Sequence, residues 1–269
     1  MKLQAHAKLN LFLEITGKRA DGYHELQSLA VFLDIADEIS ARPASEISLT
    51  GSDIEDNIIL RAAHAIKTRY GINAGIEFTL TKNIPLGAGL GGGSADAAAA
   101  LILTRKIWEL DIPDTELYEI ALTLGADVPA CLYSQLNHKN SVYFAGIGEI
   151  LTPAEIEEEL LFVLINPKKE LATKSVFEQF ILGERTPKTS RNFYERENHL
   201  ESAAIEIMPE ITTIIEDLRN FAGCKLARMT GSGATCFGIF PDKTTQQQAL
   251  QQLRAKYPAY WVEPAQLRN

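Results

Sequence analysis

The sequence predicts an α+β protein that is divided into two domains, residues 1–154 and residues 155–269. Two observations predict this class. Strand and helix patterns follow one another without the strict strand–helix–strand order of a parallel sheet, and the acidic stretch at residues 155–159 separates two apolar runs. The chain has 269 residues, of which 46% are hydrophobic and 23% charged. It is therefore long enough to bury a core without disulfides or structural metals.

The first expected element is a strand over residues 3–15. Every odd position there is apolar and nearly every even position is polar, which is the alternation of a strand with one buried face. Lys8 and Asn10 then share the polar, non-core face, where a lysine is ordinarily only a solvated charge. A loop rich in glycine and charge follows at residues 17–24, and further strands are expected at 25–33, 37–41 and 46–50.

A glycine-rich segment follows a predicted helix at residues 58–70 and a predicted strand at 76–80. Residues 85–101 read PLGAGLGGGSADAAAAL, with five glycines between positions 87 and 93. Glycines let neighbouring amides point into one hollow, and Ser94 is expected to cap an Ala-rich helix that runs to about Trp108. Because the start of a helix attracts anions, we interpret this segment as a phosphate-binding loop.

Two other interpretations of this segment are weaker. A flexible linker would need neither a helix cap nor a preceding strand. Gly87, Gly89 and Gly92 satisfy the G-x-G-x-x-G pattern of dinucleotide sites, but helices follow where a strand with a ribose-binding carboxylate would be needed. No Walker A motif is present. Asp96, in the first helical turn, is interpreted as a cap in preference to a ligand of Mg²⁺.

Near the end of the first domain, Asp127 is a second acidic residue that is a candidate for a functional site. Asp114 is expected to cap a helix that ends at Gly125. Asp127 follows in the segment Gly-Ala-Asp-Val-Pro, where Pro129 should hold Val128 extended. From the sequence alone, a turn-capping role for Asp127 is about as good as a role in a site. Short strands are expected at 141–145 and 149–152.

The second domain is expected to open with a buried strand at residues 160–165. Two later strands should be joined by the tight turn Gly231-Ser232-Gly233 within residues 225–240. The remaining elements are helices near 173–180, 198–207, 209–222 and 244–256, and a last strand at 260–263.

Composition excludes several classes of protein. The formal net charge of −9 repels nucleic-acid backbones and anionic lipids, so neither nucleic acid nor membrane is expected as a partner. The three cysteines are scattered and form no CxxC pair, which argues against a disulfide framework and a zinc site. They fit a reducing compartment, and with no secretory signal pattern after Met1 we expect a cytoplasmic protein.

Several segments resemble those of a known family. The glycine-rich loop resembles the ATP-binding motif of GHMP kinases, and AHAKLNLFLEITGKRADGYHELQS at residues 5–28 resembles the start of the 4-diphosphocytidyl-2-C-methyl-D-erythritol kinases. The family order continues with EDNIILRAA at 55–63, LGADVPACL at 124–132, GIGEIL at 146–151 and MTGSGATCFGIF at 229–240.

This resemblance implies a fold and an activity. The fold would be that of a two-domain GHMP kinase, with an N-terminal mixed sheet and helices and a smaller, ferredoxin-like C-terminal α/β domain. The activity would be transfer of the γ-phosphate of ATP, with Mg²⁺ expected, to the C2 hydroxyl of a small cytidyl diphosphate substrate in the non-mevalonate route to isoprenoids. A monomer or weak homodimer is expected.

The resemblance also implies roles for individual residues. Lys8 would be the cation near the γ-phosphate and Asp127 would accept the hydroxyl proton. Asn10 would contact the erythritol part or orient Lys8. The phosphate cradle would comprise Pro85, Leu86, Gly87, Ala88, Gly89, Leu90, Gly91, Gly92, Gly93, Ser94 and Ala95. Asn57 and Lys82 would lie near adenine, and Tyr23, His24, Thr173 and Phe177 near the cytidyl substrate.

Plainer roles remain open for some of these residues. Asn57 could be a helix cap, Lys82 a surface charge at a strand end and Phe177 a core residue. The chain also departs from the family pattern at Ala130, Cys131, Lys174 and His199, which affects the expected shape of the substrate pocket. Two other functions remain open: another GHMP kinase, acting on homoserine, mevalonate or a sugar, and a non-catalytic nucleotide-binding module.

Overall fold

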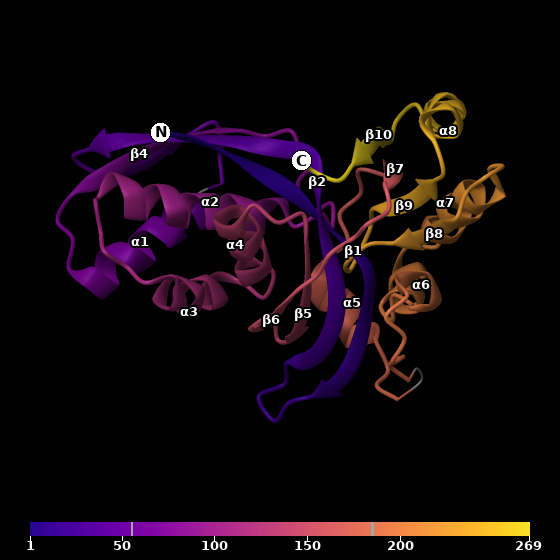
Figure 1. Cartoon of the computed structure of the whole chain (residues 1–269), viewed down its shortest axis with the longest axis horizontal. Coiled ribbons are helices and arrows are strands. Elements are labelled where there is room, and N and C mark those ends of the chain that lie inside the picture. The colour runs from indigo at the N-terminus through magenta and orange to yellow at the C-terminus, as the bar shows by residue number, and fades with distance from the viewer. Residues whose placement is uncertain (55, 184–185) are drawn as a thin grey trace.

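The computed structural model describes residues 1–54, 56–183 and 186–269, so Glu55, the first residue of the 55–63 segment, lies outside them. Two sheets lie side by side, one built by the first half of the chain and one by the second (Figure 1). Strands up to Pro153 belong to the larger sheet and strands from Leu161 onward to the smaller one. The predicted α+β class is confirmed, and the domain boundary at 154–155 stays a prediction.

The larger sheet is mixed. Within the described residues its strands are ordered β3-β4-β2-β5-β6, and β1 pairs with β2 beside this path. The β3–β4 pair is parallel and the other pairs are antiparallel. The strands are β1 (Lys2–Lys18), β2 (His24–Ala44), β3 (Ile47–Thr50), β4 (Gly75–Thr81), β5 (Ser141–Gly146) and β6 (Ile150–Pro153).

The strands β1 and β2 form one long hairpin that crosses from the outer edge of the first half to the second half (Figure 1). The predicted strands at 25–33 and 37–41 are therefore one element, because β1 pairs with β2 on both sides of the interval between them, from His24 to Ser40. Irregularities in the β1–β2 register lie between His6 and Lys8 and between Asn10 and Phe12. Lys8 and Asn10 are only 2% and 1% exposed, so the plainer interpretation of Lys8 as a solvated charge is wrong.

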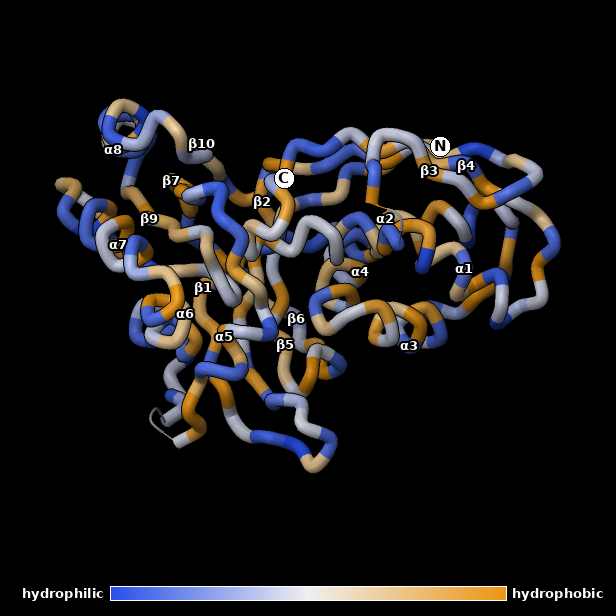
Figure 2. Tube along the Cα trace, turned by 180° about the vertical axis from the view of Figure 1, so that it is seen from behind, coloured by the Kyte–Doolittle hydropathy of each residue, from blue (hydrophilic) through white to orange (hydrophobic). Residues whose placement is uncertain are grey.

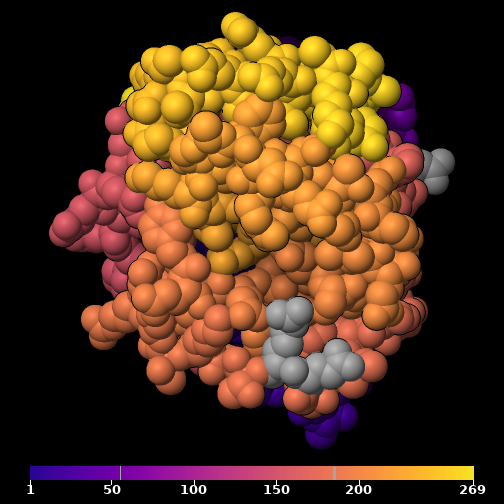
Figure 3. All heavy atoms as spheres, turned by 90° about the vertical axis from the view of Figure 1, so that its right-hand side faces the viewer, coloured from indigo at the N-terminus to yellow at the C-terminus, as the bar shows by residue number. Residues whose placement is uncertain are grey.

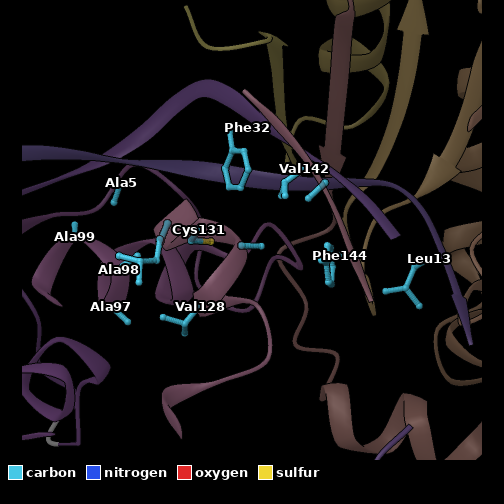
Figure 4. Packing of buried hydrophobic residues seen from close by; sticks show 14 of the residues in the cluster. Ala5, Leu13, Phe32, Ala97, Ala98, Ala99, Val128, Cys131, Val142 and Phe144 are labelled. Carbon is cyan, nitrogen blue, oxygen red and sulfur yellow. The ribbon is translucent and has the colours of Figure 1, made fainter. Parts of the chain in front are cut away.

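Helices cover the larger sheet on one face, and the outermost of them, α3, packs on the other helices (Figure 1). The central helix is buried on nearly all sides, since its alanines let the sheet and the other helices approach closely. Figure 4 shows Ala97, Ala98 and Ala99 of this helix beside Val128 and Cys131, beneath the strands of the hairpin. The helices are α1 (Ile58–Tyr70), α2 (Gly92–Ile107), α3 (Asp114–Leu124) and α4 (Val128–Asn137).

The helix α4 was not predicted. Pro129 was expected to hold Val128 extended, but Val128 and Pro129 are the first two residues of α4, where a proline costs no hydrogen bond. The expected cap at Asp114 was also wrong. Pro113 holds the N-cap position of α3, and the Asp114 carboxylate instead accepts a hydrogen bond from Arg105 at 2.6 Å.

The smaller sheet has the strand order β10-β7-β9-β8, and all of its pairs are antiparallel. With α6–α7 and α8 as its two helical connections, this part has the β–α–β–β–α–β order of a ferredoxin-like domain. It builds most of the face seen in Figure 3. The elements are β7 (Leu161–Asn166), α5 (Thr173–Gln179), a 3₁₀ turn (Phe193–Glu195), α6 (Glu201–Ile207), α7 (Glu210–Asn220), β8 (Leu226–Met229), β9 (Cys236–Phe240), α8 (Lys243–Lys256) and β10 (Trp261–Gln266).

Apolar side chains gather between the layers, and the outer turns carry polar ones. In Figure 2 hydrophobic and hydrophilic residues alternate along α3 and α7, while the outer helix α8 is largely hydrophilic. Its inner side is held by Ala249, Leu250 and Leu253, which are buried. Among the described residues, no helix combines the length and the apolar character that crossing a bilayer requires.

Candidate active site

The glycine-rich loop ends as a helix start without a side-chain cap. Gly87, Gly89 and Gly91 have φ values of 65°, 74° and 61°, a backbone region that favours glycine. Gly91 is the N-cap of α2, which begins at Gly92, so the predicted cap at Ser94 was wrong and Ser94 lies in the first turn. Residues of that turn line a cavity, and the unpaired N–H groups of a helix start are an arrangement that binds anions.

Two of these glycines also meet close neighbours. A Cβ atom at Gly89 would lie 2.4 Å from the carbonyl oxygen of Gly233, in the turn between β8 and β9. A Cβ atom at Gly91 would lie 3.0 Å from both Cβ and Cε of Lys8. The loop therefore packs directly against the second half of the chain and against the lysine of β1.

Lys8 is a buried cation that points toward the loop and a carboxylate. Its backbone N–H donates to the Leu90 carbonyl at 2.8 Å, which joins β1 to the glycine-rich loop. Its Nζ atom donates to Asn10 Oδ1 at 2.7 Å and lies 2.8 Å from Asp127 Oδ2. The exposed fraction is 2% for the Lys8 side chain and 35% for that of Asp127, so the carboxylate faces the cavity while the lysine is held behind it.

Asn10 is held by contacts from both halves of the chain. Its Nδ2 atom donates to Ser28 Oγ at 2.7 Å, and Ser28 Oγ donates to the Phe12 carbonyl. Its backbone N–H donates to Thr230 Oγ1 at 2.7 Å. These bonds fix the amide so that its oxygen faces Lys8, and they involve Ser28 and Thr230, which the sequence did not single out.

Asp127 occupies the N-cap position of α4, but its side chain makes no capping bond. The capping interpretation therefore does not account for its carboxylate, which is paired with Lys8 instead. The backbone bond from Val128 N–H to the Gly125 carbonyl forms the turn that places Asp127 at the cavity.

The cavity has a volume of about 500 Å³ and brings together residues that are far apart in the sequence. Its walls come from β1, the glycine-rich loop, the turn before α4, the start of α5 and the turn between β8 and β9. The predicted site residues in its lining are Lys8, Asn10, Lys82, the loop from Pro85 to Ser94, Asp127, Thr173 and Phe177.

A second cavity, of about 800 Å³, adjoins the first and shares Leu26, Ala126, Thr173 and Phe177 with it. Tyr23 and His24 line it from the tip of the hairpin, and Tyr23 is 65% exposed. The His24 ring is stacked on Phe177 with 5.3 Å between ring centroids. Burial and the nearby Lys18 lower the pKa of His24, so the neutral ring is favoured at neutral pH.

Thr173 connects α5 to the turn between β8 and β9. Its Oγ1 atom is 2.9 Å from Ser232 Oγ, and both side chains line the first cavity. The predicted turn Gly231-Ser232-Gly233 is present between these strands, with φ values of 58° at Gly231 and 89° at Gly233. Asn198 supports it by donating to the carbonyls of Met229 and Gly231 at 2.8 Å each.

Lys82 lies beside the start of α2 in a cluster with two acids. Its Nζ atom donates to Asp37 Oδ2 at 2.5 Å and to Asp96 Oδ2 at 2.9 Å. Asp37 Oδ1 accepts the backbone N–H groups of Asn83 and Ile84, which fixes the chain as it leaves β4. Asp96 is no helix cap, so that expectation was wrong: it is buried and binds Lys82.

Asn57 takes the plainer of its two predicted roles in this structure. Its Oδ1 atom accepts the Ile59 N–H at 2.9 Å as the N-cap of α1, and its Nδ2 atom donates to Ser52 Oγ. It does not line the first cavity, whereas its neighbour Ile58 does.

The four departures from the family pattern lie in different surroundings. Ala130 and Cys131 are buried in α4, and burial raises the pKa of the Cys131 thiol well above its ordinary value. Lys174 is exposed at the second cavity. The ring of His199 is buried and accepts the Ile15 N–H at Nδ1, a contact that joins β1 to the segment before α6.

Two family profiles match the chain. The profile of the GHMP kinases N terminal domain matches residues 57–135, and that of the GHMP kinases C terminal domain matches residues 189–259. These ranges include the glycine-rich loop and the turn between β8 and β9.

Individual proteins resemble the chain over nearly its whole length. A 4-diphosphocytidyl-2-C-methyl-D-erythritol kinase of Paramagnetospirillum magneticum is 40% identical, and the alignment covers 98% of each chain. One of Cereibacter sphaeroides is 39% identical with the same coverage. A crystal structure of a 4-(cytidine 5'-diphospho)-2C-methyl-D-erythritol kinase superposes with a TM-score of 0.83 at 29% identity, over 100% of both chains.

Proposed function

Because this chain belongs to the family of 4-diphosphocytidyl-2-C-methyl-D-erythritol kinases, within the GHMP kinases, we propose that it phosphorylates the C2 hydroxyl of 4-diphosphocytidyl-2-C-methyl-D-erythritol. ATP is the phosphoryl donor and ADP the second product. The observation that carries the proposal is the Lys8–Asp127 pair, 2.8 Å apart, in the cavity that the glycine-rich loop lines.

The loop and the start of α2 bind the phosphates of ATP. The residues of the first helical turn, Gly92, Gly93 and Ser94, line the cavity, where the unpaired N–H groups and partial positive charge of a helix start favour an anion, and glycines leave room for oxygens to approach the backbone. Phosphoryl transfer has a loose transition state, so holding the γ-phosphoryl group in place supplies much of the catalysis.

Lys8 and Asp127 act on the reacting groups. The Lys8 ammonium neutralises negative charge on the phosphoryl group as it moves. The bond between the γ-phosphorus and the bridging oxygen of ADP breaks, a bond from the C2 oxygen to that phosphorus forms, and the hydroxyl proton passes to the Asp127 carboxylate. The proton moves late, because the hydroxyl becomes acidic only as its oxygen bonds to phosphorus.

The second cavity is assigned to the cytidyl end of the substrate. The ring of Phe177 offers a flat face for a pyrimidine, and the tip residues Tyr23 and His24 offer an aromatic ring and hydrogen-bonding groups. The shared wall at Thr173 and Phe177 lets one molecule extend from the second cavity to Lys8 and Asp127 in the first.

Mg²⁺ is the expected companion of ATP. Within the described residues, no three His, Cys, Asp or Glu side chains gather where they could hold a metal on their own. Mg²⁺ that accompanies a nucleotide is usually coordinated by phosphate oxygens, water and one or two carboxylates, so such a cluster of side chains is not required. When bound, the ion neutralises phosphate charge.

We also retain a cytoplasmic location, a monomer or weak homodimer, and no nucleic-acid partner as proposals.

A coupled assay of ADP formation tests the function. The purified protein is given ATP, Mg²⁺ and either 4-diphosphocytidyl-2-C-methyl-D-erythritol or homoserine, mevalonate or a sugar. We expect turnover only with the cytidyl substrate and not with the other alcohols, and we expect CMP to inhibit competitively against that substrate. Turnover of another alcohol that CMP does not inhibit would favour another GHMP kinase, and nucleotide binding without any turnover would favour a non-catalytic module.

A further inference from the structure

The cluster of Asp37, Lys82 and Asp96 lies directly beneath the proposed phosphate cradle. Lys82 lines the first cavity, and its Nζ atom lies 3.3 Å from the position of a Cβ atom at Gly92, the first residue of α2. The same Nζ atom contacts Asp96 Oδ2 at 2.9 Å and Asp37 Oδ2 at 2.5 Å. One ammonium group thus connects the cradle to two buried carboxylates.

Of the two acids, Asp96 accepts fewer hydrogen bonds. Asp37 is fully buried, and both of its oxygens accept hydrogen bonds, from Lys82 and from the backbone of Asn83 and Ile84. Asp96 is 3% exposed, and its Oδ1 atom is buried without a hydrogen-bond partner. An ionised Asp96 has therefore lost the hydration of Oδ1 and makes no hydrogen bond there in its place, which disfavours the charged form.

The surroundings of Asp96 supply few other charges. The groups that act on it are Lys82, which follows β4, and Asp37 of β2. From α4 it faces the Cys131 thiol, which lies also near Lys8 of β1 and Asp127. The helices α1 and α3 pack against α2, and their residues Ile59, Ala63 and Ala121 belong to the same buried apolar cluster as the alanines of α2. With both acids ionised, one lysine leaves the cluster with a net negative charge beneath an anion site.

We propose that Asp96 is a positioning residue that takes up a proton when the phosphates of the nucleotide bind. Protonation makes the cluster neutral, removes the repulsion between Asp96 and the phosphates, and frees Lys82 to donate to a phosphate oxygen while Asp37 still holds it. The proton comes from solvent and is returned when the nucleotide leaves. This inference rests on the proposed nucleotide site and adds proton coupling to it.

The titration of Asp96 lies in the range that this coupling requires. Burial raises the pKa of Asp96 to about 7, with the repulsion of Asp37 adding to the effect and the attraction of Lys82 opposing it. A bound polyphosphate raises the pKa further. If it rises by one unit, binding at pH 7.5 takes up roughly half a proton, and the nucleotide binds roughly sixfold more weakly at pH 8.5 than at pH 6.5.

Calorimetry can count these protons. The full-length protein is titrated at pH 7.5 with the β,γ-imido analogue of ATP and Mg²⁺ in two buffers with different ionisation heats, and the difference in heat gives the proton number. Asp96→Asn carries a neutral group of the same shape, and the ionisation of the nucleotide itself is common to both proteins. The wild-type protein should take up roughly half a proton more than Asp96→Asn, and only the wild type should lose affinity with rising pH beyond the effect of the nucleotide.

Controls separate the possible outcomes. Asp114→Asn removes a largely exposed carboxylate at the start of α3 and should keep the wild-type proton number. Equal proton uptake by the wild type and Asp96→Asn would overturn the proposal while leaving the nucleotide site intact. Absence of binding by the wild type would overturn the nucleotide site and this inference together. If Asp96→Asn folds poorly, infrared difference spectra of the wild type decide, since binding must then produce a protonated-carboxyl band.

Discussion

At the scale of single residues, the main result is that Lys8 is buried between three partners. The ammonium contacts Asn10 and Asp127, and its methylene chain packs against Gly91. Period-2 alternation in β1 correctly indicated a strand, but it could not indicate that the polar side would also be covered. The cover comes from the glycine-rich loop and from Thr230, which lie 80 or more positions away in the sequence. Local patterns carry no information about such pairs.

Replacement of Asp127 by asparagine tests the proton acceptor. Asp127→Asn keeps the shape of the side chain but cannot accept the hydroxyl proton, so we expect kcat to fall by about 10²–10⁴-fold. Nucleotide affinity should change little, because the loop and α2 hold the phosphates. Steady-state kinetics and calorimetry with an ATP analogue measure the two quantities. Near-normal turnover by this variant would exclude Asp127 as the proton acceptor.

Replacement of Phe177 tests the assignment of the second cavity. Phe177→Ala removes the ring that stacks on His24, so we expect the KM for the cytidyl substrate to rise roughly tenfold or more. The KM for ATP should stay the same, since the glycine-rich loop and the start of α2 bind the phosphates, whereas Phe177 lies on the wall shared with the second cavity. Phe177→Tyr keeps the flat face and should restore substrate binding. A rise in both KM values with Phe177→Ala, or no rescue by tyrosine, would contradict a stacking role.

At the scale of elements, the glycine-rich loop was the most predictable part of the site. Its glycines, the preceding strand and the following alanine-rich helix are all local features, and each is present in the structure. The exact helix start was missed because Ser94 is a good cap by residue type, yet the N-cap is Gly91, in a left-handed conformation, three residues earlier. The helix α4 was missed because a proline in its second position was interpreted as a sign of extended chain.

Two glycines with nearly equal φ allow the loop to be tested against a matched control. Gly91 and Gly71 have φ values of 61° and 63°, so alanine should introduce a similar backbone strain of about 1–2 kcal/mol at each. At Gly71, the C-cap of α1, the new Cβ atom meets nothing within 4 Å. At Gly91 it meets Lys8. Gly91→Ala should therefore lower kcat strongly, and Gly71→Ala should not.

Thermal unfolding and steady-state kinetics of the two glycine variants separate strain from site geometry. Both should lose a comparable part of their stability, which thermal unfolding measures. If Gly71→Ala lost activity to the same extent as Gly91→Ala, the effect would be one of stability alone, and the packing of Lys8 against Gly91 would not matter for turnover.

At the scale of the whole molecule, the hairpin of β1 and β2 joins the two sheets. Arg228 of β8 donates to the carbonyls of Leu11, Phe193 and Arg196, which connects β1 with the segment before α6. The Glu14 carboxylate accepts from Nε and Nη2 of Arg196, at 2.9 and 2.8 Å, across 182 positions of sequence. Composition predicted two domains, but these buried polar contacts between them have no local sequence signal. The cavity depends on them, because its walls come from both halves.

The pair of Glu14 and Arg196 provides a test of that connection. The two side chains are 0% and 6% exposed, and the carboxylate also accepts the backbone N–H groups of Lys188 and Glu197. Removing the carboxylate leaves a buried guanidinium without its partner. We therefore expect Glu14→Ala to lower the free energy of unfolding by about 3–5 kcal/mol. Urea denaturation at neutral pH measures this loss.

The same carboxylate gives the stability a pH dependence of known sign. Burial pushes the pKa of Glu14 up, but the hydrogen bonds from Arg196, Lys188 and Glu197 outweigh it and hold that pKa below its ordinary value of 4.5. The unfolded chain thus takes up this proton first as the pH falls, so the stabilisation by Glu14 is complete above pH 4.5 and is lost as the pH falls through the lower pKa of the folded state.

Urea midpoints measured from pH 7 to pH 3 should converge for the wild type and Glu14→Gln. Glu38→Gln, which removes an acid from the surface pair with Lys2, should follow the wild type throughout, because an exposed pair contributes little. A constant difference between the wild type and Glu14→Gln at every pH would mean that the charge of Glu14 does not hold the two halves together.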